Sequence, residues 1–303
     1  MEQNGVSIIS PPGVTENSVG KSKSIGITLR SGSLQSAKEK LKAPWLKKME
    51  EDSTLRDKLL AVLAEFIGTA MLVFLGCTAC VGSLETPPPA IQTGLAFGIA
   101  VMIAVQSVGH ISGAHINPAI TVATVILGNK PLLMAGFYIV AQCLGSLVGY
   151  GLLKMITPEN LLYDGKDNNT IHSFCTTNIN TNLTVVHGLV IEVLATGIFV
   201  FFACAIWDSR NAKNTDSVAI KFGLCITMLA LAFAPYTGCS MNPARTFGPA
   251  VWNNHWDDHW VYWLGPIGGA IIVALIYRCL FSPKTKNQES ATHDMETFNG
   301  IET

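Results

Sequence analysis

The sequence carries little charge for its length. Only 14% of its 303 residues are Asp, Glu, Lys or Arg, whereas soluble domains average about 25%. The formal net charge of -1 leaves no excess of basic side chains, so no nucleic-acid partner is expected. The N-terminal stretch lacks an apolar run, so no cleavable signal peptide is expected either. A chain this poor in charge and 49% hydrophobic is predicted to lie in a lipid bilayer.

Motifs for enzymatic chemistry are also missing from the sequence. There is no His-Glu-x-x-His, no serine elbow and no pair of aspartates within the apolar runs, which argues against an intramembrane hydrolase. His110 and His115 have no third ligand at a suitable spacing, so neither a metal nor a cofactor is expected. Most cysteines, including Cys77 and Cys80 of a Cys-x-x-Cys pair, fall in or beside apolar runs, where cysteine packs as a small hydrophobe. We therefore predict that the protein is not an enzyme.

Six apolar runs are long enough to cross a bilayer as helices, which takes about 20 residues. They lie at about 59–81, 88–109, 132–155, 186–207, 217–236 and 260–281. Two further apolar segments, at about 117–127 and 242–252, are too short, because eleven residues make only about 16 Å of helix. The fold class predicted is an all-α membrane protein with six transmembrane helices and two re-entrant half-helices.

The tails and loops predict an orientation in the membrane. Residues 1–58 are polar, hold ten of the twenty Lys and Arg, and are expected to form a largely disordered cytoplasmic tail. An even number of spans places residues 282–303 on the same side, as a second cytoplasmic tail. The loop at 156–185 is then outside, and it carries two N-glycosylation sequons, at Asn168 and Asn182.

The apolar region, 59–281, contains an internal duplication. The segment EFIGTAMLVF, which begins at Glu65, recurs as EVLATGIFVF at Glu192, and SGAHINPA recurs as TGCSMNPA about 125 residues later. Each half, at about 59–155 and 186–281, has three full spans, so the second half enters the membrane from the opposite side. This predicts an inverted repeat whose functional site lies near the bilayer midplane, where the halves meet.

Each half places the same tripeptide at the start of its short segment. Asn is a good helix N-cap, Pro suits the first helical position, and Ala lets two helix ends approach closely. Two such ends would present amide donors and the positive ends of helix dipoles to a neutral solute in mid-membrane. Arg245 closely follows the second tripeptide, at a depth where a charge is expensive, so we expect it to be functional. The tripeptides are Asn117, Pro118 and Ala119 and, in the second half, Asn242, Pro243 and Ala244.

These motifs resemble those of the aquaporins, or major intrinsic proteins. The likeness covers residues 59–281 and includes the stretches AVQSVGHISGAHINPAITVA and YTGCSMNPARTFGPAV. It implies a homotetramer in the plasma membrane, with a passive, bidirectional pore in every subunit that excludes protons and ions. It also implies that Glu65 and Glu192 brace the half-helix loops by accepting backbone N–H groups. His115 is expected to line the cytoplasmic half of the pore.

The resemblance also assigns a narrow filter to the pore. Water-selective relatives carry a histidine where this chain has Ala230, so the opening should be wider, as in the insect glycerol-conducting branch called entomoglyceroporins. We therefore expect passage of water and glycerol, with urea as a further candidate. Cys239 would face the pore mouth and should make the channel sensitive to mercurials. The filter residues implied are Phe97, Ala230, Cys239 and Arg245.

Three other functions stay open. Thr246 and the pair Tyr262-Trp263 fit the water-channel pattern, whereas glycerol facilitators resemble NPARD at the second motif, so a strictly water-selective aquaporin is one alternative. Inverted repeats also occur in coupled secondary transporters, which would need an acidic intramembrane site beyond the two bracing glutamates. A structural junction protein with a nearly closed pore is the third.

Overall fold

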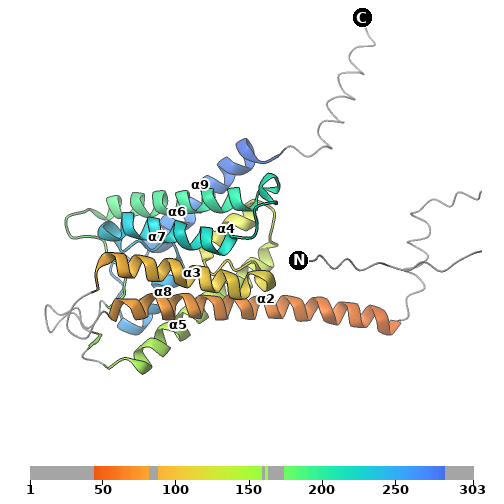
Figure 1. The fold of residues 1–303 in the computed structure, drawn as a ribbon, viewed down its shortest axis with the longest axis horizontal. Coiled ribbons are helices and arrows are strands. Elements are labelled where there is room, and N and C mark those ends of the chain that lie inside the picture. Colours follow the sequence, from red (N-terminus) through yellow and green to blue (C-terminus); the bar gives the residue numbers. More distant parts are fainter. Residues whose placement is uncertain (1–43, 82–87, 159–160, 163–173, 284–303) are drawn as a thin grey trace, which may run out of the picture. The chain divides into compact units, whose positions relative to one another are not determined.

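The computed structural model describes residues 44–81, 88–158, 161–162 and 174–283, with side chains from residue 54 onward. The described part from Asp52 onward belongs to one compact unit built of helices (Figure 1). Asn168 and the C-terminal tail beyond residue 283 lie outside the described residues. The first helix already begins at Pro44, within the segment expected to be a tail.

Six helices of the described part are long and apolar enough to cross a membrane, and no strand occurs within it. The predicted all-α class is therefore confirmed, and apart from the earlier start of the first helix the boundaries lie within a few residues of those expected. In the first span, α2 is followed by the short helix η1 (Ala79–Val81), and in the last, α9 is followed by η5 (Tyr277–Phe281). The long helices are α2 (Pro44–Thr78), α3 (Ala90–Ser112), α5 (Leu132–Ile156), α6 (Val185–Trp207), α7 (Val218–Thr237) and α9 (Val261–Ile276).

Two short helices lie among these spans, as predicted. They are α4 (Pro118–Ile126) and α8 (Pro243–Asn253), and each begins at the proline of its tripeptide. The preceding asparagine has an extended backbone and accepts a hydrogen bond from the backbone N–H two residues later. Proline at the first helical position loses nothing by lacking an N–H, so the tripeptide itself fixes where each half-helix starts.

The two halves of the chain interlock. The helix α3 packs along α7, and α6 packs along α9. The half-helix α4 of the first half contacts α9 of the second, whereas α8 of the second half contacts α5 of the first. Small residues allow these close approaches, since a Cβ added to Gly223 of α7 would lie 2.9 Å from the Gly98 carbonyl oxygen of α3. Each half-helix is thus held partly by helices of the other half.

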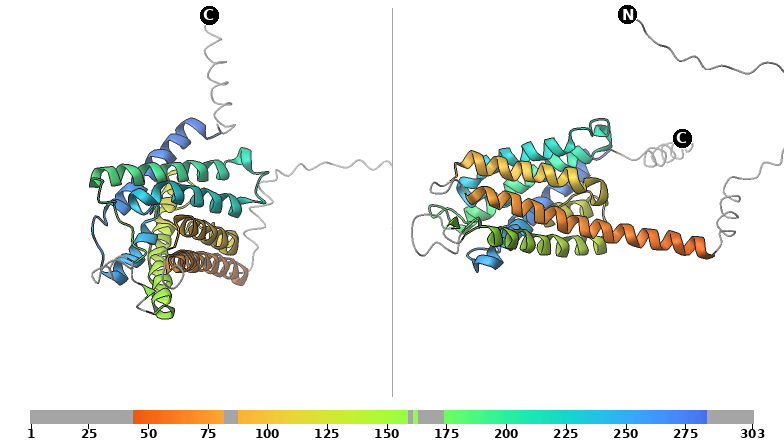
Figure 2. Two further views of the ribbon diagram at one scale, coloured as in Figure 1. Left: turned by 60° about the vertical axis from the view of Figure 1, so that its left-hand side comes forward. Right: turned by 60° about the horizontal axis from the view of Figure 1, so that its bottom comes forward.

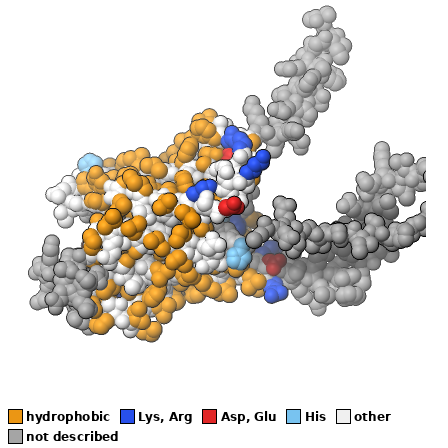
Figure 3. All heavy atoms as spheres, viewed as in Figure 1, with side chains coloured by type: hydrophobic (Ala, Val, Ile, Leu, Met, Phe, Trp, Pro, Cys, Tyr) orange, Lys and Arg blue, Asp and Glu red, His pale blue; other side chains and the backbone are white. Residues whose placement is uncertain are grey.

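Figure 2 shows the helix bundle from two further sides, and its outer surface is apolar on the face drawn in Figure 3. Hydrophobic side chains cover the face shown in Figure 3, and Lys and Arg side chains gather at one end of it. Exposed large hydrophobics occur on all six spans, for example Leu133, Met228 and Ile272. A surface of this kind fits contact with lipid, which takes the place of water around the helices.

Candidate functional site

The loops that lead into the two half-helices have the same unusual backbone. In each loop, three of four consecutive positions have positive φ, and two of those three are not glycine. Non-glycine residues rarely adopt this region, so the surroundings must hold the strained conformation in place. The recurrence of the pattern 125 residues later shows that the internal repeat extends to backbone detail. The positions are Gly113, Ala114 and Ile116, and then Gly238, Cys239 and Met241.

Glu65 of α2 holds the first loop. Its carboxylate is fully buried and accepts backbone N–H bonds from His115, at 2.8 Å, and Ile116, at 2.6 Å. It also accepts from the Ser112 hydroxyl, at 2.7 Å, and from Nε2 of Gln142, at 2.8 Å. Because every partner donates, the carboxylate acts purely as an acceptor and fixes the course of the loop toward α4.

Glu192 of α6 holds the second loop in the equivalent way. Its buried carboxylate accepts backbone N–H bonds from Ser240 and Met241, both at 2.9 Å, and a bond from the Thr237 hydroxyl at 2.7 Å. These donors occupy the positions that correspond to those around the first glutamate. Both glutamates therefore have the contacts that the predicted bracing role requires.

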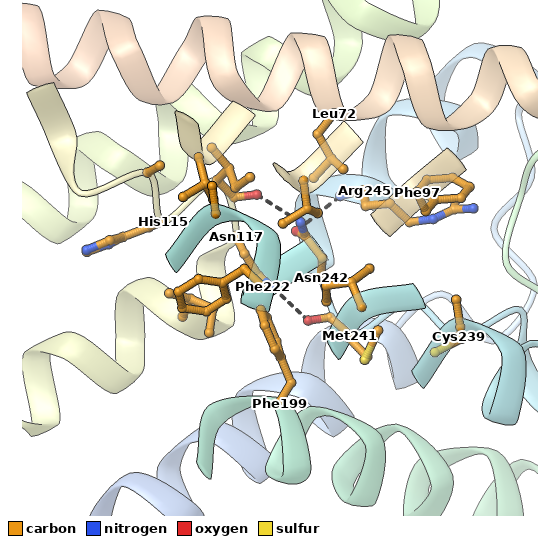
Figure 4. Close-up of a pocket in the computed structure, with 18 of the residues that line it drawn as sticks. Leu72, Phe97, His115, Asn117, Phe199, Phe222, Cys239, Met241, Asn242 and Arg245 are labelled. Atoms are coloured by element: carbon orange, nitrogen blue, oxygen red, sulfur yellow. Dashed lines mark hydrogen bonds between the residues drawn. The ribbon is translucent and has the colours of Figure 1, made fainter. Parts of the chain in front are cut away.

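The two tripeptides meet tip to tip (Figure 4). Nδ2 of Asn117 donates to the Met241 carbonyl, and Nδ2 of Asn242 donates to the Ile116 carbonyl, both at 2.8 Å. Each Oδ1 meanwhile caps its own helix, as in the 2.8 Å bond from the Ala119 N–H. An amide nitrogen carries two hydrogens. One hydrogen of each asparagine thus ties the opposite loop in place, and the second is left for a solute.

A cavity of about 460 Å³ passes these tips. Its lining reaches from Thr93 to His110 along α3 and from Val218 to Ala234 along α7, nearly the full length of both spans. The wall is largely apolar, and the polar groups that interrupt it include His115 and both tripeptide asparagines. Such a passage suits a small neutral solute that exchanges hydrogen bonds at a few points. The apolar part of the wall includes Leu72, Val101, Ile120, Phe199, Phe222 and Ile226.

The four residues assigned to the filter all line this cavity. The guanidinium carbon of Arg245 lies 4.6 Å from the centroid of the Phe97 ring, in a cation–π arrangement (Figure 4). Nη1 of Arg245 donates to the Cys175 carbonyl at 2.9 Å. Ala230 and Cys239 contribute only a methyl group and a thiol, so two walls of the arrangement are small. The structure places the four residues around one passage, and their role as a filter stays a prediction.

His115 lines the cavity beside the first tip, and its place in the cytoplasmic half of a pore stays a prediction. Its Nδ1 lies 3.2 Å from the Thr121 hydroxyl, and its ring meets the Tyr138 ring edge-on with the centroids 5.2 Å apart. Across the described ranges, no group of three His, Cys, Asp or Glu side chains is arranged to hold a metal ion. Asn182 is exposed in the turn before α6.

Sequence reasoning missed two contributors to the site. Cys175, in the connection before α6, lines the cavity, contacts Arg245 and has its Sγ 3.3 Å from that of Cys80. The pair is separated by 95 residues, so no spacing motif signals it. Thr246 was noted only as a departure from the NPARD pattern. Its hydroxyl lies 2.6 Å from the Ser240 hydroxyl and 3.1 Å from that of Thr177, and so joins the second loop to the α5–α6 connection.

Comparisons with known proteins agree with this architecture. A family model described as major intrinsic protein matches residues 52–277. Aquaporin-4 of Mus musculus is 41% identical over 227 residues, which cover 74% of this chain and 68% of that protein. Aquaporin-2 of Bos taurus is 37% identical over 242 residues, which cover 80% and 85%. The X-ray structure of the aquaglyceroporin from Plasmodium falciparum superposes with a TM-score of 0.65 at 23% identity, over 74% of this chain and 96% of that one, which shows a shared fold.

Proposed function

Because the chain belongs to the major intrinsic protein family, whose members are channels and not enzymes, we propose that it conducts water together with small neutral polyols such as glycerol. Urea is a further candidate permeant. The proposed channel is passive and excludes protons and ions. The observation that carries the polyol part of the proposal is the small side chain at Ala230, facing the same passage as Phe97 and Arg245.

The small side chain at Ala230 supports conduction of a three-carbon solute. Ala230 contributes a single methyl group, whereas a histidine would place a polar ring in the same space. Glycerol can lie with its carbon edge against the Phe97 ring and its hydroxyl groups toward Arg245. The guanidinium is fixed by the ring on one side and by the Cys175 carbonyl on the other, so its orientation is set before a solute arrives.

Charge exclusion follows from the tips and the arginine. The N-termini of α4 and α8 bring the positive ends of two helix dipoles to the middle of the passage. Arg245 adds a full positive charge to the wall, and together these groups oppose a cation or a proton. The remaining amide hydrogens of Asn117 and Asn242 would donate to a central water, which then cannot pass a proton along the file.

A strictly water-selective pore is the second candidate function. It is favoured by Thr246, whose hydroxyl bonds to Ser240 and Thr177 at the position where glycerol facilitators resemble NPARD. In this alternative, the threonine network would hold the second loop close to the passage, and Ala230 would be a packing residue.

The test is a comparison of water and glycerol permeability in proteoliposomes by stopped-flow light scattering. Wild type should pass both solutes, and Ala230→His should keep water permeation but lose glycerol permeation. The matched control is Met228→His, on the same helix α7 but on its outer face, where the side chain is exposed and does not line the cavity. It should retain glycerol permeation. A wild type that passes only water would refute the polyol proposal.

The proposed assembly is a homotetramer in the plasma membrane, with both termini in the cytoplasm. Arg210 and Lys213 in the α6–α7 connection and Lys221 in the first turn of α7 support this orientation, since basic loops stay on the cytoplasmic side. Cross-linking in native membranes would measure the subunit number. If the α5–α6 connection is extracellular, Asn182 can carry a glycan, and Asn182→Gln should then remove a mobility shift that an endoglycosidase also removes.

A further inference from the structure

Two thiols meet beside Arg245 and Phe97, two of the residues assigned to the filter, which we call the constriction. Cys80 lies in η1 at the end of the first span, and Cys175 lies in the connection before α6. Their Sγ atoms are 3.3 Å apart, and both residues line the cavity. Cys77, one helical turn before Cys80, is fully buried. A small solute that enters the passage can therefore reach the Cys80–Cys175 pair.

Arg245 makes one of these thiols the more reactive. Its Nη2 lies 3.7 Å from Sγ of Cys175, and its Nη1 donates to the carbonyl of the same residue. Burial by itself would raise the pKa of the Cys175 thiol, but hydrogen bonds from the neighbouring thiols and the nearby guanidinium outweigh burial and hold that pKa well below its usual range. The thiolate is the nucleophilic form of cysteine, so Cys175 is the thiol expected to react first.

We propose that Cys80 and Cys175 form an oxidation site at the constriction, and that a hydroperoxide converts them to a disulfide that reduces permeation. The Cys175 thiolate attacks a peroxide oxygen and becomes a sulfenic acid, while the O–O bond breaks and the departing oxygen takes up a proton as water or alcohol. The Cys80 thiol then attacks the sulfenic sulfur. An S–S bond forms and the sulfenic oxygen leaves as water. Two electrons pass from the two thiols to the peroxide.

The disulfide would disturb the anchor of Arg245. An S–S bond is about 2.05 Å long, so the two sulfurs must approach by more than 1 Å from their present 3.3 Å. Cys175 has a φ of 54°, a strained value that leaves little tolerance for such a shift. The same residue provides the carbonyl that accepts from Arg245, and oxidation also removes the negative sulfur beside the guanidinium. Arg245 is then held by Phe97 alone and can swing into the passage.

The experiment uses full-length protein in proteoliposomes, treated with a reductant, with hydrogen peroxide, or with peroxide followed by reductant. Non-reducing peptide mass spectrometry should find a Cys80–Cys175 cross-link only after peroxide. Water permeability should fall by about fivefold, the change that corresponds to about 1 kcal/mol, and should return with reductant. Cys80→Ser and Cys175→Ser should both be insensitive to peroxide. Cys143→Ser is the control that should keep the full response.

Several outcomes would overturn the proposal. A Cys77–Cys175 cross-link would show that Cys77, and not Cys80, is the partner of Cys175. A response to peroxide that is retained in Cys80→Ser would show that Cys80 does not take part. A quantitative cross-link with unchanged permeability would refute the effect on the pore. The permeability effect depends on the proposed constriction, whereas the cross-link does not. Water permeability of the reduced wild type therefore tests the proposed function separately from the oxidation site.

Discussion

The two buried glutamates should respond differently to the same substitution. In Glu192→Gln, an –NH2 group replaces one carboxylate oxygen. At the Oε2 position, it would face the Met241 N–H, which then has no acceptor in the buried loop. A hydrogen bond to a charged group contributes about 1.5–3 kcal/mol, and a buried donor without an acceptor costs about 1–3 kcal/mol. The expected loss is therefore about 3–5 kcal/mol.

Glu65→Gln should cost less because Gln142 can adapt. Within the described part of the chain, Oε1 of Gln142 is buried and has no hydrogen-bond partner, while its Nε2 donates to Glu65 and to Thr121. Rotation of the Gln142 amide would present Oε1 to the new –NH2 group and satisfy it. The Thr121 hydroxyl, which accepts from Nε2 of Gln142 and donates to the Asn117 carbonyl, would turn to donate to Oε1, and that carbonyl keeps its bond from the Thr121 N–H. The bond from the Ile116 N–H is then the main loss, so the expected cost is about 2–3 kcal/mol.

Thermal unfolding in detergent measures the difference in stability between the two variants, with the fraction of protein that stays monodisperse as the readout. A loss of 1 kcal/mol lowers the midpoint by about 2–4 °C in a domain of this size, so Glu192→Gln should lose roughly 10 °C and Glu65→Gln about half of that. In a Gln142→Met background the cost of Glu65→Gln should rise by about 1–2 kcal/mol, because the adapting amide is gone. Equal costs for the two single variants, or an unchanged cost in the Gln142→Met background, would refute this reasoning.

Two further predictions concern Cys239 at the pore mouth and Asp208 at the C-terminal end of α6. Mercurials should block water permeation in Cys175→Ser, where the other reactive thiol is gone, but not in Cys175→Ser combined with Cys239→Ser. A block that survives in the double variant would place the reactive thiol elsewhere. Asp208 accepts from Arg210 and from the Tyr277 hydroxyl, and the Arg210 bonds hold its pKa below the ordinary 3.8. Because its pKa is lower in the folded state, ionised Asp208 stabilises the fold at every pH above its ordinary pKa. Asp208→Asn should therefore lower the unfolding midpoint equally at pH 7 and pH 5. That difference should shrink only below about pH 4, and a difference already lost at pH 5 would contradict the assignment.

Much of the fold can be read from the sequence because the bilayer imposes simple rules. Apolar run length separates the six spans from the two half-helices, and the repeated tripeptide marks where α4 and α8 begin. The repeat also implies that Glu65 and Glu192 occupy equivalent places. These features depend on local chemistry or on comparison of the chain with itself, so they need no knowledge of distant contacts.

The details of the site depend on contacts between distant parts of the chain. Hydropathy does not reveal that Asn117 donates to the opposite loop, because that bond joins residues 124 positions apart. The same holds for Cys175, which reaches Arg245 from a polar connection with no motif of its own. Gln142 looks like an ordinary polar residue in a span until its contact with Glu65 is seen. These contacts form only when the two halves interlock.

The most direct test of the central claim is to measure water, glycerol and proton flux on one preparation of wild-type proteoliposomes. The account predicts water and glycerol permeabilities well above those of protein-free vesicles, with proton flux at the protein-free level. Glycerol flux no higher than in protein-free vesicles would contradict the wide constriction at Ala230. Proton flux that rises with protein content would contradict charge exclusion by Arg245 and the paired asparagine tips.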